Sequence, residues 1–356
     1  MRRRRYLILA PGEFKENAKT AQGVIRYGDD ETVAVIDPTL AGKSVREVVP
    51  HLQSEAPFVA SVAEGLRYEP TALLIGTAPQ GGALPPAWRS EVLAAIDAKL
   101  EIVSGLHDIL NDDPEFAAAA HANDTRIWDV REPPAVPLFS GAAYAVEPPI
   151  LLLVGNDCAV GKMTVAIELC AAAKARGSRA AFVPTGQTGI MIAGWGIAVD
   201  RVISDFATGA AEQLVLQAAK DDPGLIVVEG QGAINHPAYA PVTLSLMYGA
   251  APDALVLVCE VPHDAIPTFG TPVLGYRALI DLHEALLATV KPARVVGIAL
   301  NTRTIADDAD ARKEIARARA ETGLPADDVV RFGPAALYDA VLPSILKRQP
   351  LSETTP

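Results

Sequence analysis

The residues best suited to chemistry lie in a glycine-rich segment, GNDCAVGKMT, at positions 155–164. The apolar run ILLLVG, residues 150–155, precedes it, and a helix-forming stretch follows. A buried strand that turns into a helix in this way aims free backbone N–H groups and the positive end of the helix dipole at an anion. Gly161 lets the backbone approach a phosphate closely, and Lys162 adds a positive charge. The segment therefore predicts a phosphate-binding loop. The residues expected to contact phosphate are Gly155, Asn156, Asp157, Cys158, Ala159, Val160, Gly161, Lys162, Met163 and Thr164.

One position of this loop departs from the common pattern. A nucleotide-hydrolysing loop has Ser or Thr directly after Gly-Lys, and that hydroxyl binds magnesium. Here Met163 follows Lys162, and the hydroxyl arrives one residue later, at Thr164. Thr164 reaches the usual position only if the helix begins later than usual. The departure counts against hydrolysis more than against phosphate binding. If a magnesium nucleotide is used, Thr164 and Glu229 are the expected metal ligands.

Two further segments carry glycines and polar groups at the ends of expected strands. FVPTGQTG (182–189) follows the second strand of this half, and LIVVEGQGAINHP (225–237) ends the third. The carboxyl ends of parallel strands meet at one edge of a sheet, where ligands bind. We expect substrate contacts from Thr185, Gly186, Gln187, Thr188, Gly189 and Gln231.

Three side chains in these segments are candidate proton acceptors: Glu229, Asp157 and His236. Glu229 ends an apolar strand, where it can orient a metal-bound water or act as a base. A helix-capping or ion-pairing role for Glu229 is less favoured because glycines flank it. Cys158 is a possible acyl-carrying nucleophile, but a small packing residue is the commoner role of cysteine in such a loop.

These motifs need a framework of parallel strands to bring them together. Short β-branched runs alternate with helical stretches along the whole chain, which predicts an α/β fold with helices on both faces of open parallel sheets. Strands are expected at 6–10, 32–37, 71–78, 100–106, 125–130, 150–155, 179–184, 224–229, 253–260, 293–300 and 328–332. Helices are expected at 86–100, 162–176, 208–220, 274–290, 307–322 and 334–347.

A proline-rich connector divides the chain. Residues 131–149 contain five prolines, which remove backbone donors and favour an extended conformation. We therefore expect two domains, 1–140 and 141–350, in keeping with a length of 356 residues.

Composition excludes several classes of protein. The net charge of −12 argues against non-specific nucleic-acid binding. Three widely spaced cysteines suggest neither a disulfide framework nor a zinc site. The apolar run 6–10 is too short for a signal peptide, and no stretch reaches the length of a membrane span. We expect a soluble cytoplasmic protein that contacts no membrane.

The three motifs resemble two known groups of proteins. The longer loop with Asp157 inside it, together with the Glu-Gly-x-Gly segment, is similar to dethiobiotin synthetase and related P-loop enzymes. With APGEFKENAKTAQGVIRY (10–27) and AVIDPTLAGKSV (34–45), nearly the whole chain resembles a narrower family. That family, the DgcN family of D-glutamate N-acetyltransferases, joins a Rossmann-like N-terminal domain to a modified P-loop domain of the NTPase-like, doubly wound type.

This resemblance implies transfer of an acetyl group from acetyl-CoA to the amine of D-glutamate, in D-amino-acid catabolism. The enzyme DgcA would be the pathway partner that processes the product. Coenzyme A carries a pyrophosphate and a ribose phosphate, which a P-loop lysine can hold without hydrolysis. A dicarboxylate substrate needs cations. Lys19 and Arg26 are candidates, against the alternative of a solvated helix face. Arg277 and His263 are a second pair of candidates, in a Pro- and Gly-rich loop of the kind that often covers a site. The N-terminal domain is expected to serve substrate binding or the assembly of a homo-oligomer.

Two alternatives remain open. The chain is either an ATP- and magnesium-dependent enzyme of the dethiobiotin synthetase type, or a nucleotide-binding switch without turnover. Met163 counts against the first alternative, and the paired glycine loops count against the second.

Overall fold

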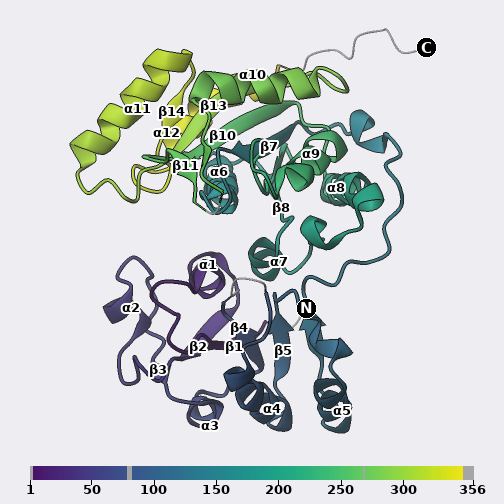
Figure 1. Ribbon diagram of the computed structural model, residues 1–356, viewed down its shortest axis with the longest axis vertical. Coiled ribbons are helices and arrows are strands. Elements are labelled where there is room, and N and C mark those ends of the chain that lie inside the picture. The colour runs from purple at the N-terminus through teal and green to yellow at the C-terminus, as the bar shows by residue number, and fades with distance from the viewer. Residues whose placement is uncertain (1–2, 78–81, 268, 348–356) are drawn as a thin grey trace. The chain divides into compact units, whose positions relative to one another are not determined.

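The computed structural model describes residues 3–77, 82–267 and 269–347, and its contacts divide the chain into two units (Figure 1). Unit 1 comprises residues 1–133 together with 187–201, and unit 2 comprises 134–186 together with 202–356. The first passage between the units falls at Pro133/Pro134, inside the proline-rich connector. The sequence predicted one boundary, at 140/141, and did not predict that residues 187–201 return to unit 1. We call this segment the excursion.

Unit 1 is built on a six-stranded sheet with the strand order β3-β2-β1-β4-β5-β6. Every neighbouring pair in it is parallel. This order is that of a Rossmann fold, as expected. The strands are β1 (Arg5–Leu9), β2 (Glu31–Ile36), β3 (Phe58–Val59), β4 (Ala72–Ile75), β5 (Glu101–Ser104) and β6 (Ile127–Asp129). The two-residue β3 had no signal in the sequence, because it is too short to show a pattern.

Helices cover both faces of this sheet. Alternate residues of β1 enter different cores: Ile8 packs with Phe14 of one cluster, and Leu7 and Leu9 pack with Val92 of the other. The helices are α1 (Lys19–Tyr27), α2 (Val45–Val48), α3 (Val62–Gly65), α4 (Arg89–Asp97), α5 (Pro114–Ala122) and α7 (Gln187–Ala193). Short 3-10 turns lie at Leu66–Tyr68, Pro86–Trp88, Leu110–Asp112 and Val199–Arg201.

The excursion of residues 187–201 is anchored by one buried cation. Arg131 donates to Gly105 O (2.8 Å) and to Gln187 Oε1 (2.8 Å), and it pairs with Asp200. Ile190 of α7 is buried in the unit 1 core. A segment that the sequence places within the P-loop half is therefore fixed as part of the Rossmann-like unit.

Unit 2 contains a second six-stranded parallel sheet, with the order β14-β13-β10-β7-β9-β8. Together the two sheets confirm the expected α/β fold class. The strands are β7 (Ile150–Gly155), β8 (Ala180–Val183), β9 (Leu225–Val228), β10 (Ala254–Glu260), β13 (Arg294–Asn301) and β14 (Ala326–Asp327). A small antiparallel pair, β11 (Ala265–Ile266) and β12 (Thr271–Pro272), follows β10.

The P-loop strand β7 lies inside this sheet, between β10 and β9. On one face, α6 and α12 contact each other, and Leu169 and Val341 share a buried cluster with Leu153. The helices are α6 (Lys162–Ala175), α8 (Ser204–Ala219), α9 (Ala240–Gly249), α10 (Tyr276–Leu287), α11 (Asp308–Thr322) and α12 (Ala335–Ile345), with a 3-10 turn at Ala142–Ala145.

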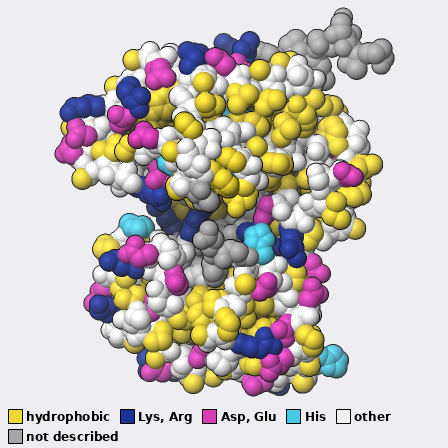
Figure 2. Space-filling view, viewed as in Figure 1, with side chains coloured by type: hydrophobic (Ala, Val, Ile, Leu, Met, Phe, Trp, Pro, Cys, Tyr) yellow, Lys and Arg dark blue, Asp and Glu magenta, His cyan; other side chains and the backbone are white. Residues whose placement is uncertain are grey.

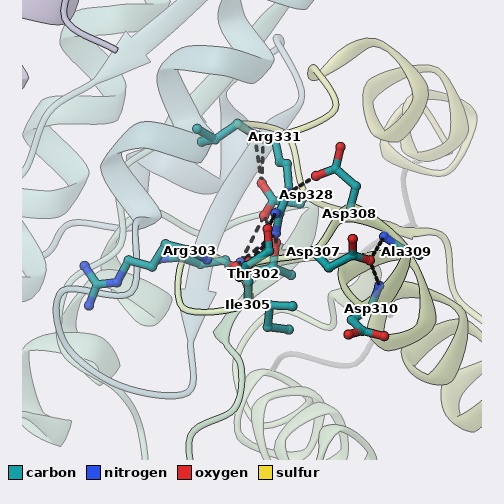
Figure 3. A network of polar contacts seen from close by, with 12 residues as sticks. Thr302, Arg303, Ile305, Asp307, Asp308, Ala309, Asp310, Asp328 and Arg331 are labelled. Atoms are coloured by element: carbon teal, nitrogen blue, oxygen red, sulfur yellow. Dashed lines mark hydrogen bonds and ion pairs between the residues drawn. The ribbon is translucent and has the colours of Figure 1, made fainter. Parts of the chain in front are cut away.

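The strand expected at 328–332 is wrong, since the last strand ends at Asp327. The cause is the buried carboxylate of Asp328 (Figure 3). Its Oδ1 accepts from the N–H groups of Val330 (3.1 Å) and Arg331 (3.0 Å), which bends the chain into a turn. Its Oδ2 accepts from Thr302 N (2.9 Å) and Thr302 Oγ1 (2.6 Å), which ties that turn to the end of β13.

Acidic and basic side chains are mixed on the surface of helix α11, on the face of the molecule drawn in Figure 2. Lys313 pairs with Asp310 and Arg317 pairs with Glu314, both at a spacing of three residues. Among the described residues, no helix is both long and apolar enough to cross a membrane.

Loss of the Arg131 side chain should loosen the attachment of residues 187–201 to the rest of unit 1. We expect Arg131→Met to lower the free energy of unfolding by about 2 kcal/mol, because it leaves the acceptor oxygens of Gly105 and Gln187 without their donor. It should also open 187–201 to proteases. The measurements are urea unfolding and limited proteolysis. Arg126→Met, at an exposed position, is the control and should cost less than about 1 kcal/mol. Equal small losses in both variants would contradict the anchoring role.

Candidate active site

The loop between β7 and α6 has the geometry of an anion site. Gly161 precedes the helix with φ +108°, a left-handed conformation that favours glycine. Because the N-cap residue is Gly161, it has no side chain that could cap the first turn of α6. The first N–H groups of a helix otherwise need an acceptor, and an oxyanion fits there.

Lys162 is buried at the centre of the site, with 5% of its surface exposed. Its Nζ donates to Asp157 O (2.7 Å) and to Gly232 O (2.8 Å). The ammonium therefore joins the phosphate loop to the glycine segment after β9. This juxtaposition is the one expected from the positions of the motifs at strand ends.

Two asparagines hold the loop against the neighbouring strands. Asn156 pairs with the backbone of Glu260, donating to its carbonyl and accepting from its N–H, each at 3.2 Å. Asn301, at the end of β13, donates to Val160 O (3.0 Å). The loop is therefore held to β10 and β13 by side-chain hydrogen bonds to backbone groups.

The second and third motifs also bind each other. The Glu229 carboxylate accepts from Thr185 N (3.0 Å) and Gly186 N (3.3 Å), and Thr185 Oγ1 donates to Glu229 O (3.0 Å). The amide of Gln231 donates to the carbonyl of Thr185. Gly230 has no room for a side chain, since a Cβ there would lie 1.6 Å from Leu153 O. The Glu-Gly-x-Gly sequence thus allows β9 to end against β7.

A cluster of imidazole and carboxylate groups stands at the phosphate loop. Asp157 Oδ2 lies 2.7 Å from Nε2 of His263, and Asp157 Oδ1 lies 3.7 Å from Nε2 of His236. The sequence interpretation selected His236 and Asp157 as bases, and it gave His263 only a possible substrate-binding role beside Arg277. The signal for His263 is weak, because the residue is 106 positions away from Asp157 and lies outside the three motifs.

Asp157, Cys158 and His236 offer ligand atoms within 4.8 Å of one another, which raises the question of a metal. The hydrogen bonds of His236 argue against this use. Its Nδ1 accepts from the N–H groups of Ala238 (3.1 Å) and Tyr239 (3.2 Å). A neutral imidazole with an accepting Nδ1 carries its proton on Nε2, which then has no lone pair for a metal. Asp157 and His236 are therefore better described as hydrogen-bonding groups.

The hydroxyl of Thr164 does not move into the magnesium position. Helix α6 begins at Lys162, so Met163 is its second residue and Thr164 its third. Met163 is buried. The late helix start that Thr164 requires is absent, so the residue directly after Lys162 supplies no oxygen to a metal.

The other expected substrate contacts belong to other elements of the two units. Arg277, in the first turn of α10, donates to Thr322 O (2.8 Å). Gln187, Thr188 and Gly189 belong to α7 in unit 1, where Thr188 pairs with the hydroxyl of Thr20 (3.0 Å). Lys19 and Arg26 are both in α1 of unit 1, and the Arg26 guanidinium lies over the ring of Tyr27. Their roles stay predictions.

A pocket of about 580 Å³ lies beside the phosphate loop within unit 2. Asn156 and His263 line it from the loop side, and Tyr276 and Arg317 line it from α10 and α11. Its wall includes the acidic side chain of Glu260, which pairs with Arg303. The sequence interpretation did not find this pocket, because its walls come from segments that are far apart in the chain.

Asn235 is a further polar group that the motifs alone did not single out. Both its amide atoms are buried and have no hydrogen-bond partner among the described residues. An unmet buried amide costs about 1–3 kcal/mol. Its position next to His236 makes it a candidate for contact with a ligand.

Two family descriptions match the chain. A Rossmann-like domain of unknown function, DUF1611_N, matches residues 38–133. The P-loop domain of the same family, DUF1611_C, matches residues 137–338.

Curated relatives and one crystal structure extend this similarity over most of the chain. A D-glutamate N-acetyltransferase from Tritonibacter scottomollicae is 36% identical over 76% of this chain and 80% of its own. Another from a Pseudoalteromonas species is 34% identical over 77% and 82%. The crystal structure of a DUF1611 family protein from Anabaena variabilis has a TM-score of 0.91 and 40% identity, covering 96% of this chain and 99% of its own.

Truncation of Lys162 tests the anion site directly. We expect Lys162→Ala to weaken binding of coenzyme A or of a nucleotide at least about tenfold, which corresponds to about 1.4 kcal/mol, because the buried positive charge is lost. Lys174→Ala, on an exposed position of the same helix, is the control. The measurement is titration calorimetry with each ligand. Unchanged affinity in Lys162→Ala would show that phosphate binds elsewhere.

Proposed function

The chain belongs to the DUF1611 family, and from that premise we propose that it transfers an acetyl group from acetyl-CoA to the amine of D-glutamate. The observation that carries the proposal is the pair of curated relatives, both named D-glutamate N-acetyltransferase, which match about three quarters of the chain. The phosphate loop supports it independently, since it keeps the anion-binding parts and lacks the hydroxyl that hydrolysis needs.

The loop suits the phosphates of coenzyme A. Lys162 and the N-terminus of α6, whose N-cap residue is a glycine, supply a positive charge and N–H donors, which are what a pyrophosphate needs. Bound acetyl-CoA would supply the thioester, whose carbonyl carbon accepts the amine. No metal is required to hold it, which fits the methionine at position 163.

Acetyl transfer further requires a proton acceptor and donors for the developing oxyanion. Of the proposed bases, Glu229 already receives two backbone N–H groups, and His236 uses Nδ1 as an acceptor. Both are better suited to positioning the glycine loops. Backbone N–H groups of the loops 185–189 or 229–232 are the candidate oxyanion donors.

Buried thiols do not offer an acyl-carrying step. Burial raises the pKa of the Cys170 thiol to about 12, and it raises the pKa of Cys259 still further. A thiol with a high pKa is a poor nucleophile at neutral pH. These two thiols are thus unsuited to carry an acyl group. We propose direct transfer from the thioester to the amine, and Cys158 keeps the loop-packing role expected from the sequence.

The dicarboxylate substrate would be held by cations, for which Lys19, Arg26 and Arg277 are proposed. The acetylated product would pass to the pathway partner DgcA. The alternative, an ATP- and magnesium-dependent enzyme, is disfavoured by the helix start at Lys162, which leaves Met163 at the metal position.

The activity is tested by thiol release. Purified protein is mixed with acetyl-CoA and D-glutamate without ATP or added metal, and free thiol is followed. We expect release that depends on D-glutamate and is slower with L-glutamate. Formation of ADP from ATP and magnesium, without D-glutamate-dependent thiol release, would contradict the proposal.

The hydroxyl of Thr164 gives a second test. We expect Thr164→Val to leave the thiol-release rate within about threefold of wild type, because no step uses this hydroxyl as a metal ligand; threefold is about 0.65 kcal/mol in barrier height. Met163→Thr, which restores the common pattern, should not raise the rate. The measurement is the same assay with EDTA present. A large loss in Thr164→Val that magnesium modulates would indicate a metal site.

A further inference from the structure

The pocket beside the phosphate loop is lined by the imidazole of His263, which the sequence did not predict as a base. We propose that His263 accepts the proton of the acceptor amine and that Asp157 orients it. This inference rests on the proposed acetyl transfer and names a catalytic residue for it.

His263 lies between the phosphate loop and the pocket. It follows β10 and precedes the β11–β12 pair, and its side chain is 16% exposed. It contacts the phosphate loop through Asp157 and also lines the 580 Å³ pocket. His263 therefore stands where a ligand held by the phosphate loop and a second ligand in the pocket would meet.

The hydrogen bonds of Asp157 show which nitrogen of His263 carries the proton. Asp157 Oδ1 accepts from Cys158 N (2.6 Å), and an ionised carboxylate can only accept. In the 2.7 Å contact with Oδ2, Nε2 of His263 is therefore the donor. The neutral ring then has its lone pair on Nδ1, which has no hydrogen-bond partner among the described residues. A carboxylate that fixes the tautomer of an imidazole in this way prepares the other nitrogen as a base.

The remaining candidates are less suited to the task. Nδ1 of His236 receives two backbone N–H groups, so its lone pair is already used. The Glu229 carboxylate holds the N–H groups of Thr185 and Gly186. His263 is the imidazole of this cluster whose second nitrogen is not committed to the described backbone.

The step balances without any further reactant. His263 Nδ1 takes one proton from the ammonium of the amino acid, and the nitrogen lone pair forms a bond to the thioester carbonyl carbon. The C–S bond then breaks, and a second proton moves from nitrogen to the departing sulfur. The products are the N-acetyl amino acid, the free thiol of coenzyme A, and one proton that the imidazolium returns to solvent.

Three variants distinguish a base from a residue that only holds its own loop to the phosphate loop through the hydrogen bond to Asp157. His263→Gln keeps a side-chain N–H for Asp157 but has no basic nitrogen. His263→Ala removes both and leaves space for added imidazole. His121→Gln, on exposed α5 of unit 1, is the control. Each is assayed for thiol release with D-glutamate as in the parent assay, with thermal unfolding to confirm the fold.

We expect His263→Gln to lower kcat by about 10²–10⁴-fold, the range for loss of a general base, with KM changed little. Imidazole should restore part of the rate of His263→Ala. The rate of His121→Gln should match that of wild type and should not change when imidazole is added. Asp157→Asn combined with His263→Gln should lose no more than the worse single variant, because the two residues act as a unit.

A purely structural role of the His263–Asp157 hydrogen bond would give the opposite pattern. If His263→Gln keeps its kcat within about threefold while only His263→Ala is impaired, and imidazole does not help, the inference is overturned; threefold corresponds to about 0.65 kcal/mol. Failure of the proposed function is distinguishable, since the wild-type protein would then show no D-glutamate-dependent thiol release at all. If His263→Gln fails to fold, imidazole rescue of His263→Ala alone decides the question.

Discussion

The buried ammonium of Lys162 is the constraint on which the site depends. A charge removed from water is tolerated only where oxygens replace its hydration, and here the carbonyls of Asp157 and Gly232 do so. One carbonyl comes from the loop after β7 and the other from the loop after β9. The lysine therefore requires that both strands end together, and it places a positive charge where their glycine loops meet.

The rest of unit 2 maintains this meeting point. Asn156 and Asn301 hold the phosphate loop against β10 and β13. Glu229 holds the loop after β8 by two N–H groups. Each of these side chains lies at a strand end and binds the backbone of a neighbouring strand end or loop, so the strand order of the sheet becomes a fixed arrangement of three glycine loops. Arg331 does the same for the loop after β13, where it donates to the carbonyls of Thr302, Ile305 and Ala306 (Figure 3).

Much of this arrangement could be predicted because it follows from local pattern. Buried parallel strands are apolar runs, and the glycine motifs after them identify the edge where ligands bind. The strand expected at 328–332 failed because its apolar pair Val329–Val330 lies in a turn that the Asp328 carboxylate forms, and such a turn depends on a single side chain. The placement of 187–201 in unit 1 could not be predicted either, because it depends on Arg131, more than fifty residues earlier in the chain. The pairing of His263 with Asp157 could not be predicted for the same reason, since the two residues are 106 positions apart.

The central claim is that the phosphate loop holds an acyl carrier without a metal. Titration calorimetry of coenzyme A against the wild-type protein, first with EDTA and then with excess magnesium, tests it most directly. The account predicts saturable binding with the same dissociation constant in both conditions, and weaker binding of ATP. Binding that appears only with magnesium, or a clear preference for magnesium ATP, would contradict it and return the loop to nucleotide chemistry.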